Sequence, residues 1–316
     1  MVETTRRQLL LGTAAAGAAI LANALPARAE PRKTRAELNP YALRSGPMDA
    51  PFVPRRGYAD GPYGQVHFRD TGAGLPLVLC HQAPQTSRQF SNVYEPLHRR
   101  GIRAIGVDTP GFGESDPAPF VPTIEDWAGV IPAVLDHLEL AQADVLGHHT
   151  GAMVATEVAL QFPARVRRLI VNGPLPVDDA QRQEYLEGLQ EREIDFRYLG
   201  DGSHLQASFA TRFRMYGEGA DPKTITRYAV EKFQGYAPFW IGHHAAFIYD
   251  HAAAMRKVKH DTLILTNTGD VINEEAHEAR QLRPDFAFAE LDGGGVDIVD
   301  QQPEAWADAV AAFLKA

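Results

Sequence analysis

The 316-residue sequence has little of what several classes of protein depend on. It contains a single cysteine, Cys80, so no disulfide can form within one chain. Cys80 closes an apolar run at 76–80, which favours a buried side chain over a nucleophile. Positive charge is also scarce, with 31 lysines and arginines against 40 acidic residues and a net charge of −9. Such an acidic chain is a poor partner for nucleic acid or anionic lipid, and we expect neither.

Long hydrophobic runs are missing too, and the apolar segment near the start has the features of an export signal. TRRQLLL at 5–11 is a twin-arginine pattern, and an Ala- and Gly-rich stretch follows at 12–25. A stable membrane span needs about 20 strongly apolar residues, more than this segment offers. We therefore predict a cleaved signal at 1–29, read by the twin-arginine (Tat) export machinery. The mature protein is expected to be periplasmic or secreted, without stable membrane insertion.

The rest of the sequence alternates between predicted strands and helices. Residues 30–56 are rich in proline and weakly periodic, which predicts an irregular arm. Short apolar runs typical of buried parallel strands follow, separated by helical patterns. The expected strands are 65–70, 75–81, 102–108, 143–148, 167–172, 262–266 and 287–291, and the expected helices are 87–100, 124–140, 151–162 and 303–314. This order predicts an α/β fold with a mostly parallel central sheet flanked by helices.

The alternation stops between 175 and 258, where the pattern is helical, first charged and then aromatic. An insertion after the sixth strand is expected to lie over the carboxyl ends of the strands, where open parallel sheets bind ligands. The sequence therefore predicts a helical cap at 175–258 and a core made of 57–174 and 259–316.

Three motifs in order resemble the α/β-hydrolase superfamily. They are His81, the loop VDTPGFGESD at 107–116 and the turn GHHTG at 147–151. The capped branch that contains epoxide hydrolases and haloalkane dehalogenases is the most similar. The resemblance covers roughly 57–316, and it implies an α/β-hydrolase fold and a small-molecule substrate. We expect no cofactor and no metal.

The catalytic positions of this family are filled unusually. The glycines of the 147–151 turn place His149 where the family carries serine, cysteine or aspartate. Asp270, after the strand at 262–266, matches the family's catalytic acid. Val296 stands where the family has its catalytic histidine. A conventional nucleophile with its base is therefore missing.

Two interpretations of this double departure stay open. In the first, His149 extends into the space that Val296 leaves free and hydrogen-bonds Asp270, which fixes the imidazole tautomer. His149 then acts as a general base, or as a nucleophile that forms an acyl-imidazole. In the second, the site has decayed and His149 only fills a pocket. A register centred on Thr150 is a further alternative, although it removes both flanking glycines.

The segment HQAP at 81–84 matches the family's HGxP. The resemblance implies that the backbone amides of Ala83 and Thr150 form the oxyanion hole. Gln82 replaces a glycine, and it either adds a side-chain amide to this hole or packs outward.

Four further residues are candidates for substrate binding. They are His81 and the cap residues Trp240, His243 and His244. Neighbouring histidines on a helix point in different directions, so no metal is expected at 243–244, nor at 148–149.

The sequence thus predicts an exported enzyme that hydrolyses an ester-like or other carbonyl bond of a small apolar substrate. Lyase or isomerase chemistry with His149 as general base is the second hypothesis. A ligand-binding homologue without turnover is the third.

Overall fold

The structure is a computed structural model that describes residues 52–217 and 219–316. The predicted signal at 1–29 and most of the arm predicted at 30–56 lie outside the described residues. Among the helices that are described, none is both long and apolar enough to cross a bilayer.

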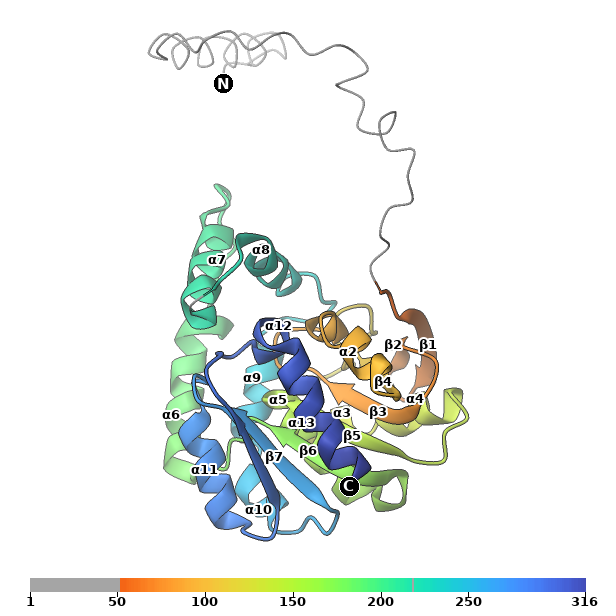
Figure 1. The fold of residues 1–316 in the computed structure, drawn as a ribbon. Coiled ribbons are helices and arrows are strands. Elements are labelled where there is room, and N and C mark those ends of the chain that lie inside the picture. Colours follow the sequence, from red (N-terminus) through yellow and green to blue (C-terminus); the bar gives the residue numbers. More distant parts are fainter. Residues whose placement is uncertain (1–51, 218) are drawn as a thin grey trace, which may run out of the picture. The chain divides into compact units, whose positions relative to one another are not determined.

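Within the described residues, eight strands form one sheet in the order β1-β2-β4-β3-β5-β6-β7-β8. The β1·β2 and β2·β4 pairs are antiparallel, and every other pair is parallel. Helices cover both faces of the sheet (Figure 1). The strands are β1 (Arg55–Gly61), β2 (Gly64–Asp70), β3 (Leu75–Cys80), β4 (Ile102–Val107), β5 (Ala143–His148), β6 (Val166–Asn172), β7 (Thr262–Asn267) and β8 (Ala287–Leu291). The predicted fold class is confirmed.

Successive side chains along the central strands point to opposite faces of the sheet, so the apolar core is divided between the two faces. On β3, Leu77 and Leu79 pack with Trp306 of α13 (Pro303–Lys315), while Val78 and Cys80 join the core on the opposite face. Each fully buried leucine contributes roughly 1.5–3 kcal/mol. Burial raises the pKa of Cys80 to about 12, so its thiol is a packing group rather than a nucleophile.

Prolines divide two of the predicted helices. The segment 87–100 forms a 3-10 turn, η1 (Ser87–Phe90), followed by α2 (Tyr94–Arg99), with Pro96 in the first turn of α2. The segment 124–140 forms α3 (Ile124–Ala128) and α4 (Ile131–His137), with Pro132 in the first turn of α4. Proline lacks an amide hydrogen and fits the first turn of a helix. Each predicted helix is therefore split, and a second helix begins near the proline.

The sequence analysis missed β1. This strand starts at Arg55, inside the predicted arm, so the core begins earlier than residue 57. Only Ala59 of β1 is buried, because the strand lies at the edge of the sheet. An edge strand that buries a single small side chain leaves no alternation of apolar residues to detect.

The chain leaves the sheet after β6 and returns at β7, as predicted for an insertion after the sixth strand. The helices between them are α6 (Asp179–Leu189), the π-helical turn η3 (Gln190–Ile194), α7 (Ser203–Tyr216), α8 (Pro222–Glu231), α9 (Ile241–Ile248) and α10 (His251–Met255). Helices α9 and α10 both pack against α5 (Thr150–Gln161), so the last part of the segment predicted as cap is integrated into the core. Figure 1 shows α7 and α8 side by side at one end of the sheet.

Candidate active site

The carboxyl ends of neighbouring strands converge on one cavity of about 610 Å³. Gln82 and Ala83 follow β3, His149 and Thr150 follow β5, and Val296 follows β8. Cap residues from α6, η3, α7, α8 and α9 also line the cavity. The site therefore lies where a parallel sheet with an inserted cap is expected to bind its ligand.

His149 occupies a tight turn between β5 and α5. Its backbone is left-handed, with φ 50° and ψ −113°, which costs a non-glycine residue of the order of 1–3 kcal/mol. The His149 amide donates to the carbonyl of Asn172 at 2.8 Å, which stabilises this conformation. A Cβ at Gly147 would lie 1.8 Å from the carbonyl oxygen of Gly151, so the turn closes only with glycine there.

The imidazole of His149 points at the predicted acid. Its Nε2 lies 2.8 Å from Oδ2 of Asp270, whose side chain is fully buried, whereas the His149 side chain is 15 % exposed. Val296 is buried and lines the same cavity. The hydrogen bond that the sequence suggested is thus present, and its catalytic role stays a prediction.

Gly173 makes room for the His149 ring and was not singled out from the sequence. A Cβ at this position would lie 2.5 Å from Cδ2 of His149. Gly173 follows β6, and a single glycine at a strand end gives no sign of which side chain approaches it.

The charge on Asp270 fixes the tautomer of His149. Burial acts to raise the pKa of Asp270, but His149 and the Ile272 amide outweigh it and hold that pKa below its ordinary value. A carboxylate only accepts hydrogen bonds, so Nε2 of His149 carries the proton. Its Nδ1 is then the unprotonated nitrogen, and it has no hydrogen bond to any described residue. The arrangement can accept a proton at Nδ1 while Asp270 stabilises the resulting imidazolium.

His148 lies beneath His149, and their ring centroids are 4.5 Å apart. Gln89 accepts the Gln82 amide at its Oε1, at 2.9 Å, and therefore presents its Nε2 as a donor to Nδ1 of His148. Burial, with His149 nearby, holds the pKa of His148 well below its usual range. Neutral His148 consequently carries its proton on Nε2, a buried donor without a partner among the described residues.

This tautomer bears on metal binding. One ligand atom each from His148, His149 and Asp270 lie within 4.8 Å of one another, a spacing that could hold an ion. Binding through Nε2 of His148 would require its proton to move to Nδ1, where the amide donor of Gln89 faces it. The hydrogen bonds around His148 therefore oppose a metal at this position.

Two backbone amides beside His149 match the predicted oxyanion hole. Ala83 and Thr150 both line the cavity, and neither amide donates to another described residue. Thr150 is the first residue of α5, whose amino end favours negative charge. The Gln82 side chain also lines the cavity, and its Nε2 donates to Oδ1 of Asp297 at 3.0 Å.

Only one of the four residues predicted to bind substrate lines the cavity. His81 is buried, donates from Nδ1 to the Gln82 carbonyl at 2.9 Å and accepts the Thr109 amide at Nε2, at 3.1 Å. Both ring nitrogens are engaged, so His81 holds the turn rather than contacting a ligand. Trp240 and His244 are outside the lining as well. Trp240, just before α9, and His244 on α9 contact each other, with ring centroids 5.7 Å apart, on a side of the helix that does not line the cavity.

His243 does line the cavity, with Nδ1 2.8 Å from Oε1 of Glu193. Other cap residues, missed by the sequence analysis, complete this polar side. Arg192, Arg212 and Lys232 line the cavity, and burial lowers the pKa of Lys232. A charged helical segment is usually solvated, so no signal in the sequence distinguished these residues. The remaining lining is largely apolar and aromatic.

The comparisons with known proteins agree with the fold described above. The sequence model of the family described as alpha/beta hydrolase fold matches residues 76–283. The chain belongs to this family. This α/β hydrolase is 33 % identical over 132 residues to 2-hydroxymuconate semialdehyde hydrolase of Pseudomonas sp. (strain CF600), a match covering 41 % of the chain and 46 % of the relative. It is 32 % identical over 126 residues to haloalkane dehalogenase 2 of Mycobacterium bovis, covering 40 % and 43 %. The matches thus span less than half the length of these curated relatives.

Solved structures match the α/β hydrolase over a longer stretch. An esterase from Exiguobacterium antarcticum has a TM-score of 0.70 at 19 % identity, covering 83 % of the chain and 100 % of the esterase. A thermophilic esterase from Thermogutta terrifontis, with malate bound, has a TM-score of 0.66 at 23 % identity, covering 83 % and 98 %. At these identities the likeness establishes the fold alone.

Proposed function

We propose that this α/β hydrolase cleaves an ester-like or other carbonyl bond of a small, largely apolar substrate, using His149 and Asp270. The observation that carries the proposal is the 2.8 Å contact between Nε2 of His149 and Oδ2 of Asp270. It leaves Nδ1 as a base beside a cavity that two free backbone amides also line. The names of the relatives, a semialdehyde hydrolase among them, support hydrolysis as the reaction class.

The reaction follows from these positions. Nδ1 of His149 takes a proton from water as the water oxygen attacks the substrate carbonyl. The amides of Ala83 and Thr150 donate to the oxyanion, while Asp270 stabilises the imidazolium. The proton on Nδ1 then passes to the leaving alkoxide as the carbon–oxygen bond breaks, giving an acid and an alcohol. His149 returns to its neutral form.

The cavity favours a substrate with an apolar body and one polar end. Its lining is mostly apolar, and the cations Arg192, Arg212 and Lys232 belong to the cap side. Of the three, Arg212 pairs with Asp297 of the last loop. A carbonyl compound with a carboxylate or hydroxyl toward Arg192 and Lys232 would match this distribution.

The test is hydrolysis of p-nitrophenyl acetate and butyrate by wild type, His149→Ala, Asp270→Ala and His244→Ala. His244 is a cap histidine outside the cavity lining, so its variant controls for the loss of an imidazole. We expect His149→Ala to lose at least about a hundredfold in kcat/KM, and His244→Ala to stay near wild type. Equal activity in all four proteins would refute the dyad. Proton abstraction from a substrate without acyl transfer would instead indicate lyase or isomerase chemistry.

We also propose that the protein is exported through the twin-arginine pathway and processed after Ala29. The pattern at 5–11 and the small residues before position 30 support this. Replacing Arg6 and Arg7 together by lysine should abolish export, measured by fractionation of a bacterial host and sequencing of the mature amino terminus. Unchanged export of the double variant would contradict the proposal.

A further inference from the structure

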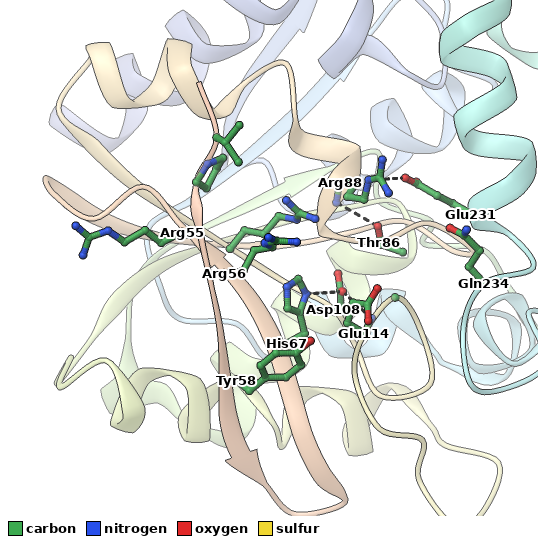
Figure 2. Close-up of a pocket in the computed structure, with 14 residues that line it drawn as sticks. Arg55, Arg56, Tyr58, His67, Thr86, Arg88, Asp108, Glu114, Glu231 and Gln234 are labelled. Atoms are coloured by element: carbon green, nitrogen blue, oxygen red, sulfur yellow. Dashed lines mark hydrogen bonds and ion pairs between the residues drawn. The ribbon is translucent and has the colours of Figure 1, made fainter. Parts of the chain in front are cut away.

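A second cavity, about 1010 Å³ in volume, lies beside the β1–β2 hairpin (Figure 2). It shares no lining residue with the candidate active site. Charged side chains dominate its wall, from β1, β2, η1 and the carboxyl end of α8. The catalytic scheme makes no use of these groups, so their arrangement needs another explanation.

Two arginines of this cavity face each other directly. Arg56 of β1 and Arg69 of β2 are partners in the antiparallel register, so their side chains leave the same face of the ribbon. Among the described residues, neither forms an ion pair with an acidic group, and Nε of Arg69 is buried without a hydrogen-bond partner. Like charges directly opposite each other on a sheet are destabilising, and an anion between the two guanidinium groups would remove that cost.

The next pair on the same face of the ribbon, Tyr58 and His67, contacts other side chains of the protein. Tyr58 and His67 are register partners with ring centroids 5.3 Å apart. Nδ1 of His67 lies 2.8 Å from Oδ2 of Asp108, which also accepts the Glu114 amide at 3.1 Å, while Oδ1 accepts the Ser87 amide at 2.6 Å. The carboxylate of Asp108 is thus held by these groups, and among the described residues it forms no ion pair with Arg56 or Arg69.

Glu231 supplies a second, independent sign of a ligand. It is 4 % exposed and lines the cavity, and Figure 2 shows its carboxyl group facing Arg88, whose Nε lies 2.9 Å from Oε1. That ion contact is not aligned as a hydrogen bond, and neither carboxyl oxygen has a hydrogen-bond partner among the described residues. Burial raises the pKa of Glu231. The ion pair with Arg88 involves Oε1 alone, and a buried Oε2 without a polar partner is costly unless a ligand hydroxyl or amine meets it.

We propose that this cavity binds a small organic anion, a carboxylate or phosphate, whose charge lies between Arg56 and Arg69 and whose hydroxyl group meets Glu231. Arg56, Arg69 and Glu231 all line this one cavity, so a single small molecule bound there can meet both ends of the site. Guanidinium groups bind carboxylate and phosphate oxygens through paired hydrogen bonds, and two arginines on one face can hold one anion together. The site is independent of the proposed hydrolysis.

Calorimetric titration of the full chain with malate and succinate tests the proposal, because these dicarboxylates differ by one hydroxyl. We expect malate to bind about tenfold more tightly than succinate, and Glu231→Met to abolish that difference. Arg56→Gln and Arg69→Gln should each weaken malate by at least about tenfold. Arg55→Gln is the comparison variant, because Arg55 belongs to the same wall but its side chain leaves the opposite face of β1 and points away from Arg56 and His67 (Figure 2). Competition with inorganic phosphate ranks phosphate against carboxylate.

A stability readout separates a ligand site from a structural role. Without anions, Arg56→Gln should raise the Tm, because it removes a like-charge pair, whereas one fixed concentration of malate should raise the Tm of wild type and Arg55→Gln by more than that of Arg56→Gln. A lowered Tm for Arg56→Gln without anions would mean that the arginine pair serves the fold, and would overturn the proposal. So would an equal loss of binding in Arg55→Gln, or the absence of saturable binding of any of the three anions.

Discussion

Replacing Asp270 by asparagine tests the proposed dyad with little change of shape. If the asparagine oxygen faces Nε2 of His149, it still accepts that proton and only the charge is lost; if it stays with the Ile272 amide, the asparagine NH2 faces Nε2 and the loss of activity is larger. At 2.8 Å, two unit charges attract by about 6 kcal/mol at an effective dielectric constant of 20. Water reaches the His149 side chain, which is 15 % exposed, and screens part of this.

A hydrogen bond to a charged group contributes roughly 1.5–3 kcal/mol after such losses. Because the imidazolium forms in the transition state, losing this stabilisation of roughly 1.5–3 kcal/mol lowers kcat. We expect Asp270→Asn to lower kcat by about 10- to 150-fold with little change in KM. Asp270→Ala, which also removes the acceptor, should lose more.

The assay is ester hydrolysis by the two single variants and the double variant with His149→Ala. If Asp270 acts through His149, its replacement costs nothing further once the imidazole is gone. The same fractional loss in both backgrounds would show that Asp270 works elsewhere, and would refute the dyad. Thermal unfolding of each variant serves as the control for stability.

Other predictions concern the metal, the missing triad histidine and acid stability. Prolonged dialysis against EDTA should leave hydrolysis unchanged, and loss restored by Zn²⁺ would contradict the tautomer assigned to His148. The double variant His149→Ser with Val296→His should recover ester hydrolysis lost in His149→Ser alone, measured as kcat/KM, because it rebuilds serine, imidazole and carboxylate around Asp270. Burial acts to raise the pKa of Asp70. Arg103 donates to both oxygens of this carboxylate, at 2.9 and 2.8 Å, and holds its pKa below the usual value. That stabilisation is present above the unfolded pKa and fades as the pH falls through the folded one, so Asp70→Asn should lose about 1–2 kcal/mol at pH 7 and less at pH 3, by urea unfolding.

The features predicted correctly from the sequence are those fixed by short stretches of chain. The turn around His149 depends on glycines two residues to either side, so a stretch of five residues is enough to indicate it. Strand ends of a parallel sheet meet at one edge, so the loop that carries Asp270 could be placed near the turn without knowledge of any contact.

What the sequence did not reveal depends on contacts between distant segments. His81 looked like a pocket residue, but the Thr109 amide, 28 positions away, occupies its Nε2. Glu193 and Lys232 belong to segments whose composition resembles solvated surface, and only the folding of the cap brings them into the cavity. Arg56 and Arg69 are partners in a register that involves β1, an edge strand that could not be predicted from a pattern of apolar residues.

The position of the base favours one of the two roles considered for His149. Nδ1 is the ring nitrogen next to the carbon that bears the side chain, whereas Nε2 is occupied by Asp270. An acyl group on Nδ1 would crowd Cβ and the left-handed backbone of the turn, whereas a water molecule needs less room. We therefore expect general-base catalysis with no acyl-enzyme intermediate. Rapid mixing with p-nitrophenyl acetate should give no burst of p-nitrophenol, and quenched enzyme should retain its unmodified mass. A stoichiometric burst with an acetyl group mapped to His149 would assign it the role of nucleophile and overturn the steric argument.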